Sequence, residues 1–134
     1  EVLGVIPQFM VDQGWNNPRS SQTIITQTMH ERKSTICELS DAMVALPGGI
    51  GTFEVLLVCL TWKQLGLHCN PVVILNTDGY FDRLIDCLDY MVEQQMMRPI
   101  HREMFTVVNS PEEVLPALLS AEEWDPNTRR LASI

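Results

Sequence analysis

Three glycines within four residues, Gly48, Gly49 and Gly51, lie between an apolar run and a long apolar-rich segment. The run at 42–46 predicts a buried strand, and the segment from Thr52 onward predicts a helix. Glycines let a backbone approach a ligand closely, and the free N–H groups at the start of a helix attract anions. The sequence therefore predicts a phosphate-binding turn. An ordinary strand-to-helix turn that is rich in glycine is the alternative.

A cationic pair, Arg32 and Lys33, is the second candidate for anion chemistry. It falls near the start of a predicted helix at 29–40, where cations oppose the helix macrodipole. A guanidinium fork and an ammonium both suit a phosphate, whereas a solvated pair with acidic partners is the structural alternative. The neighbouring His30 does not begin a zinc-binding HExxH motif, because Ser34 occupies the position of the second histidine.

Predicted strands and helices alternate along the chain, without visible internal repeats. Short apolar or β-branched runs predict strands at 1–7, 23–28, 42–46, 71–76 and 105–108, and periodic apolar segments predict helices at 29–40, 52–67, 81–97 and 111–120. This alternation predicts an α/β fold with a parallel sheet and right-handed crossovers. Ligands of such sheets bind beyond the carboxyl ends of the strands, where the three glycines fall.

Composition limits the classes of function. The 134 residues suffice for one modest domain, and the net charge of −8 disfavours binding to nucleic acid. The four cysteines form no CxxC pair, so we expect no metal site and reduced core thiols in a cytoplasmic protein. No apolar run reaches the roughly 20 residues that cross a bilayer, and no secretory leader is visible, so we expect no membrane partner.

Five separated motifs resemble the LOG (Lonely Guy) family of cytokinin-activating enzymes. They are MHERK at 29–33, SDA at 40–42, LPGGIGT at 46–52, TWKQLG at 61–66 and NTDGY at 76–80. The resemblance runs from residue 2 to about residue 119. It implies a Rossmann-like fold and hydrolysis of the N-glycosidic bond of a nucleoside 5′-monophosphate, either a cytokinin riboside monophosphate or AMP. The products are the free base and ribose 5-phosphate. The resemblance further implies no cofactor, and a homodimer or higher oligomer.

The resemblance also implies roles for individual residues. Arg32 takes the place of the family's catalytic arginine, and Lys33 and Thr61 line the same pocket. The remaining substrate-binding positions are Gly48, Gly49, Ile50, Gly51, Thr52 and Glu54. The resemblance implies that the glycine N–H groups and the Thr52 hydroxyl hold the phosphate.

The chain departs from the family motif PGGxGTxxE at its last position, where Val55 replaces the expected catalytic glutamate. Glu54 is adjacent, but one residue along a helix turns a side chain by roughly 100°. Val58 also stands where family members often carry an acid, so an acidic stripe becomes apolar. The alternative to hydrolysis is therefore a non-catalytic, nucleotide-binding homologue.

The second departure is length. In family members, two further strands and a glycine-rich segment come before the region that corresponds to the start of this sequence. One of those strands is central to the sheet. We therefore expect 1–120 to form a partial Rossmann-like nucleotide-binding domain with an exposed apolar sheet edge, followed by a loosely ordered tail at 121–134. A remnant that serves mainly to form dimers is a third reading.

Overall fold

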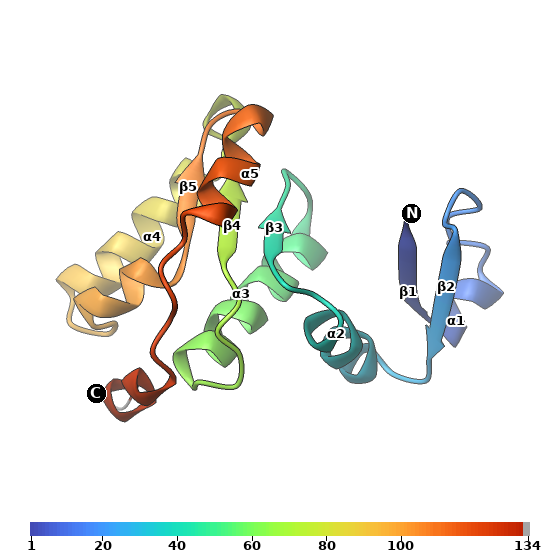
Figure 1. Cartoon of the computed structure of the whole chain (residues 1–134), viewed down its shortest axis with the longest axis horizontal. Coiled ribbons are helices and arrows are strands. Elements are labelled where there is room, and N and C mark those ends of the chain that lie inside the picture. The colour runs from blue at the N-terminus through green and yellow to red at the C-terminus, as the bar shows by residue number, and fades with distance from the viewer. Residues whose placement is uncertain (133–134) are drawn as a thin grey trace. The chain divides into compact units, whose positions relative to one another are not determined.

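The computed structural model of the chain describes residues 1–132. These residues form two compact units, Glu1–Ser40 and the part that begins at Asp41, and each unit is described by itself. Both combine parallel strands with helices, so the predicted α/β class is confirmed (Figure 1). The described strands form a two-stranded parallel sheet in the first unit and a three-stranded parallel sheet in the second, which is consistent with a Rossmann-like fold.

The first unit is built on strand β1 (Leu3–Pro7), which pairs in parallel with β2 (Gln22–Thr26). A short helix, α1 (Gln8–Asp12), follows β1 directly and takes the beginning of the predicted loop at 11–21. The Gln8 amide donates a hydrogen bond to the Asp12 carboxylate at 2.8 Å, a contact of the i, i+4 type that favours a helical turn.

Helix α2 (Met29–Glu38) follows β2. Its first turn is closed by side chains, because the Thr28 hydroxyl accepts from the Glu31 N–H at 3.1 Å and the Glu31 carboxylate accepts from the Gln27 N–H at 2.7 Å. The helix ends two residues earlier than predicted. Leu39, the residue that follows the helix, is 57% exposed.

The second unit has a parallel sheet of order β3 (Met43–Ala45), β4 (Val72–Leu75) and β5 (Thr106–Val108). The central strand β4 is buried along its whole length, as the run PVVILN predicts. Successive side chains of β4 point to opposite faces of the sheet, and each face is covered by helices. Helices α3 (Ile50–Gln64) and α4 (Asp82–Glu93) cover one face, and α5 (Pro111–Leu119) covers the other (Figure 1).

Helix α3 buries one stripe at helical spacing, formed by Leu56, Cys59, Leu60 and Lys63. Its composition predicts burial on more than one side, but Leu57 is 41% exposed and Ile50 is 90% exposed. β3 lies at the edge of the described sheet, and its Val44 is 40% exposed.

Three 3-10 segments complete the described chain: η1 (Thr77–Gly79), η2 (Pro99–Met104) and η3 (Pro126–Leu131). The last predicted helix is confirmed as α5, and Ser110 and Glu113 form a capping box at its start. A loosely ordered tail was wrong for its described part. Trp124 is only 6% exposed, and its indole N–H donates to the Lys63 carbonyl at 2.9 Å.

All four thiols are free. Cys59 is buried, as predicted for a core thiol, but Cys87 is exposed on α4. No helix within residues 1–132 is long and apolar enough to cross a membrane.

Candidate phosphate site

The glycine turn joins the carboxyl end of β3 to the amino end of α3. Gly49 is the residue before the first helical turn, and its carbonyl accepts from the Thr52 N–H at 2.9 Å and from the Phe53 N–H at 3.3 Å. The N–H groups of Ile50 and Gly51 come earlier in the same turn, so they have no helical carbonyl four residues before them. They are donors available to a ligand at the helix start.

Side chains leave this helix start open to an anion. Gly49 provides no capping side chain, and the first turn of α3 holds no acidic residue. The starts of α2 and α5 differ, because side chains there accept hydrogen bonds from main-chain N–H groups. These side chains belong to Thr28 and Glu31 at α2, and to Ser110 and Glu113 at α5. A helix of 15 residues carries about half a positive charge at its amino end. An anion of phosphate size therefore meets both donors and a favourable field at the α3 start.

The three glycines have different steric roles. A Cβ built on Gly48 would overlap the Thr52 hydroxyl and lie 3.1 Å from the Thr52 Cβ. A Cβ built on Gly49 or Gly51 would meet nothing within 4 Å. Gly48 is therefore required for the Thr52 hydroxyl to lie against the turn, whereas Gly49 and Gly51 border open space that a ligand could use.

A second loop, which follows β4, supports the glycine turn. The Tyr80 hydroxyl donates to the Gly48 carbonyl at 2.6 Å, and the Tyr80 ring makes edge contacts with Phe53 and Phe81 at centroid distances of 6.5 and 5.1 Å. β3 and β4 are parallel neighbours, so the two loops leave the same edge of the sheet. Tyr80 thereby fixes the direction of one carbonyl in the turn.

Buried Asn76 holds this second loop in shape. Its side chain donates to the Asp82 carboxylate at 2.8 Å and accepts from the Phe81 N–H at 2.7 Å. Gly79 adopts a φ of +71°, which glycine tolerates best. Tyr80 is not among the predicted site residues, although the NTDGY motif directly after a buried strand was a signal for it.

The remaining predicted positions of α3 lie along its length. Val55 and Val58 are half-buried, and Glu54 is exposed, so Glu54 does not take the place of a carboxylate at position 55. The Thr61 hydroxyl donates to the Leu57 carbonyl at 2.8 Å within the helix. At 1.5 Å rise per residue, Thr61 lies about 13 Å along the axis from Thr52, so one phosphate cannot contact both residues.

Arg32 and Lys33 belong to the first unit, on the first half of α2. The Arg32 Nε donates to the Val5 carbonyl of β1 at 2.9 Å, so this guanidinium nitrogen is held by a main-chain oxygen rather than by a carboxylate. Lys33 is buried, with 8% exposure. The two cations thus lie on one turn of α2, in the first unit. The other predicted positions, from Gly48 to Thr61, all lie in the second unit.

Metal-binding residues do not gather in the described part of the chain. Among residues 1–132, no group of three or more His, Cys, Asp and Glu side chains is placed to hold a metal ion.

Comparison with known proteins identifies the family. Residues 1–118 match the family described as "Possible lysine decarboxylase". The chain is 36% identical over 132 residues to the probable cytokinin riboside 5'-monophosphate phosphoribohydrolase LOGL2 of Oryza sativa subsp. japonica, covering 98% of this chain and 53% of the relative. It is 39% identical over 126 residues to the cytokinin riboside 5'-monophosphate phosphoribohydrolase LOG2 of Arabidopsis thaliana, covering 93% and 57%.

A third relative, the cytokinin riboside 5'-monophosphate phosphoribohydrolase LOG3 of Arabidopsis thaliana, is 36% identical over 132 residues, which are 98% of this chain and 60% of the relative. The chain thus spans little more than half the length of these relatives. The family match covers both units and includes the glycine turn and the Arg32–Lys33 pair. The chain therefore belongs to the LOG family, as the motifs of its sequence predict.

Proposed function

We propose that this chain binds a nucleoside 5′-monophosphate, with the phosphate at the glycine turn, and that its reaction is hydrolysis of the N-glycosidic bond to free base and ribose 5-phosphate. The observation that carries the proposal is the uncapped start of α3, where Gly48 makes room for the Thr52 hydroxyl. The printed names of the relatives, which specify a cytokinin riboside 5'-monophosphate, support this substrate class. AMP is the second candidate substrate.

The reaction makes two chemical demands. Cleavage of a ribosyl bond develops oxocarbenium-like positive charge, which a carboxylate stabilises while it activates water. The family motif would supply that carboxylate at position 55, one helical turn beyond the phosphate donors, where this chain has Val55. Arg32 is the proposed catalytic arginine, and Lys33 is the proposed neighbour that balances phosphate charge.

A non-catalytic, nucleotide-binding homologue is the second candidate function, and Val55 favours it. The apolar pair Val55 and Val58 removes a carboxylate without disturbing the phosphate donors, which lie earlier in the helix. Under this reading the nucleotide binds and turnover is very slow.

Base release from AMP and from a cytokinin riboside monophosphate, measured on the wild type and on Val55→Glu, separates the two candidates. A positioned general base contributes about 10²- to 10⁴-fold to a rate, so the variant should gain at least about 10²-fold if the carboxylate is the missing group. Leu57→Glu is the matched control and should change the rate little, because it adds the same carboxylate two residues further along α3, turned by roughly 200° from position 55, at a side chain that is 41% exposed. Wild-type turnover at the rate of the glutamate variant would refute the role assigned to position 55.

We also propose a homodimer or higher oligomer and a cytoplasmic location, as the family resemblance and the free thiols suggest. Size-exclusion chromatography with light scattering tests the first, and a monomer at micromolar concentration would contradict it.

A further inference from the structure

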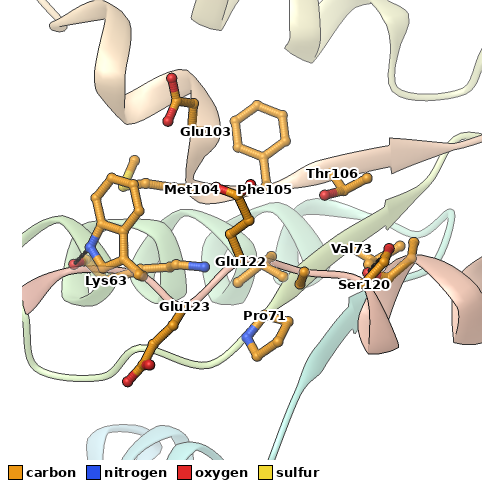
Figure 2. Close-up of a pocket in the computed structure, with 14 residues that line it drawn as sticks. Lys63, Pro71, Val73, Glu103, Met104, Phe105, Thr106, Ser120, Glu122 and Glu123 are labelled. Atoms are coloured by element: carbon orange, nitrogen blue, oxygen red, sulfur yellow. Dashed lines mark hydrogen bonds between the residues drawn. The ribbon is translucent and has the colours of Figure 1, made fainter.

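The sheet of the second unit has a pocket at the edge opposite the glycine turn. It has a volume of about 400 Å³ and lies by the residues that precede β4 and β5, with walls from the end of α3 and from the segment after α5. Its volume is in the range of small-molecule sites. The residues that carry its chemistry are Lys63, Glu103, Glu122 and Glu123, which Figure 2 labels, together with Trp124.

Lys63 is an unusual lysine. Only 4% of it is exposed, and Figure 2 shows its side chain extending into the pocket. Its Nζ donates to the Asn70 carbonyl at 3.0 Å and lies 5.7 Å from the centroid of the Trp124 ring. Since an ammonium carries three donors, this single described hydrogen bond and one aromatic face replace its hydration incompletely.

Lys63 is also held in place from the main-chain side. The indole N–H of Trp124 donates to the Lys63 carbonyl at 2.9 Å, and Trp124 itself is buried among core residues. Burial lowers the pKa of the Lys63 ammonium below its usual range, and the neighbouring Cys69 opposes this shift to a smaller extent. A lysine that is neutral more often than usual is a better nucleophile, because the free amine is the reactive form.

We propose that Lys63 is a carbonyl-reactive site that forms an imine with a small uncharged aldehyde bound in this pocket. The ammonium first releases a proton to solvent or to a carboxylate of the pocket rim. The Nζ lone pair then forms a bond to the carbonyl carbon while the C=O electron pair moves to oxygen, which takes up a proton. Loss of that oxygen as water, with the remaining N–H proton released, leaves the C=N bond. No electron donor or acceptor is needed.

The charge of the pocket supports an uncharged ligand. Glu103, Glu122 and Glu123 line the pocket and are exposed, so an anionic carbonyl compound meets repulsion there. Trp124 and the aliphatic part of the wall, from Pro71 and Val72, suit a short alkyl chain. The site lies at the opposite ends of the strands from the glycine turn, so it does not depend on the proposed nucleotide function.

The chain contains only two lysines, Lys33 and Lys63, which allows an internal comparison. The intact 134-residue protein is treated at neutral pH with propionaldehyde and sodium cyanoborohydride, which reduces an imine to a stable secondary amine. Peptide mass mapping then gives the labelling rate at each lysine and at the N-terminal amine. Lys33 is a suitable reference because it is nearly as buried, with 8% exposure.

We expect Lys63 to be labelled several times faster than Lys33 in the folded protein, because burial lowers the pKa of the Lys63 ammonium and so raises the fraction of the reactive free amine. In concentrated urea the two rates should become equal to within about twofold. Lys63→Arg keeps a cation over Trp124 and should remove the label at position 63 while leaving that at Lys33. Labelling of Lys63 that is no faster than that of Lys33 in the folded protein would overturn the proposal. So would a rate ratio unchanged by unfolding.

Discussion

The effect of Gly48→Ala can be worked out from the packing of the glycine turn. The added Cβ would overlap the Thr52 hydroxyl, with the Thr52 Cβ at 3.1 Å and its Cγ2 at 3.5 Å, so the Thr52 side chain or the turn must move. A displaced hydroxyl no longer donates to a phosphate. A hydrogen bond to a charged group contributes about 1.5–3 kcal/mol, and about 1.4 kcal/mol corresponds to tenfold in Kd. We therefore expect AMP to bind Gly48→Ala about 10- to 150-fold more weakly.

The matched variant is Gly49→Ala, whose Cβ meets no protein atom within 4 Å and whose φ of −81° suits alanine. Urea denaturation should give the same free energy of unfolding as the wild type to within about 0.5 kcal/mol. Isothermal titration calorimetry then compares AMP binding by the wild type and both variants. If Gly48→Ala binds AMP as tightly as the wild type while remaining folded, the assignment of the Thr52 hydroxyl to the phosphate is refuted.

Further predictions concern the support of the turn, the helix face and the buried histidines. Tyr80→Phe removes the 2.6 Å hydrogen bond to the Gly48 carbonyl but keeps the ring contacts. The free energy of unfolding should therefore fall by about 0.5–1.5 kcal/mol, and AMP should bind a few-fold more weakly. Unchanged values of both quantities would show that Tyr80 does not position the turn. Val55→Glu should raise base release at least about 10²-fold over the wild type, with Leu57→Glu as the control that leaves the rate unchanged. Burial lowers the pKa of His68 and of His101 below 6.5, and each ring has one buried nitrogen without a partner among the described residues. The unfolded chain then binds more protons than the folded chain below pH 6.5, so the free energy of unfolding should fall as pH decreases from 7.5 to 5.5. His101→Gln should make this pH dependence weaker. A free energy of unfolding that is independent of pH over this range would contradict the burial of both rings.

Local patterns predicted the elements of the second unit well. The apolar run before Asn76 became β4, and Ser110 with Glu113 formed the expected cap of α5. Such features depend on residues within a few positions of one another, so their physics is present in the sequence itself. The glycine turn is of the same kind, since its strand-turn-helix order lies within 42–52.

Contacts between distant positions could not be predicted. Tyr80 and Gly48 are 32 positions apart, and Trp124 and the Lys63 carbonyl are 61 positions apart. Both pairs depend on which strands become neighbours, and a tryptophan in a polar segment gives no local sign of what it will contact. Strand order within each unit could not be predicted for the same reason, because alternation of strands and helices does not specify it.

The family resemblance predicted what local physics could not, namely that Arg32 and the glycine turn belong to one reaction. It also made Val55 informative, since an apolar residue on a half-buried helix face is otherwise unremarkable. The proposed phosphate donors come before position 55 in α3, so the rate of hydrolysis is the part of the proposal that depends on Val55.

Calorimetric titration of the whole chain with AMP and with adenosine tests the central claim most directly. If the start of α3 binds the 5′-phosphate, AMP should bind at least about 10²-fold more tightly than adenosine, because two or more charge-assisted hydrogen bonds depend on the phosphate. Equal affinity for the two ligands, or no binding of AMP by folded protein, would contradict the account.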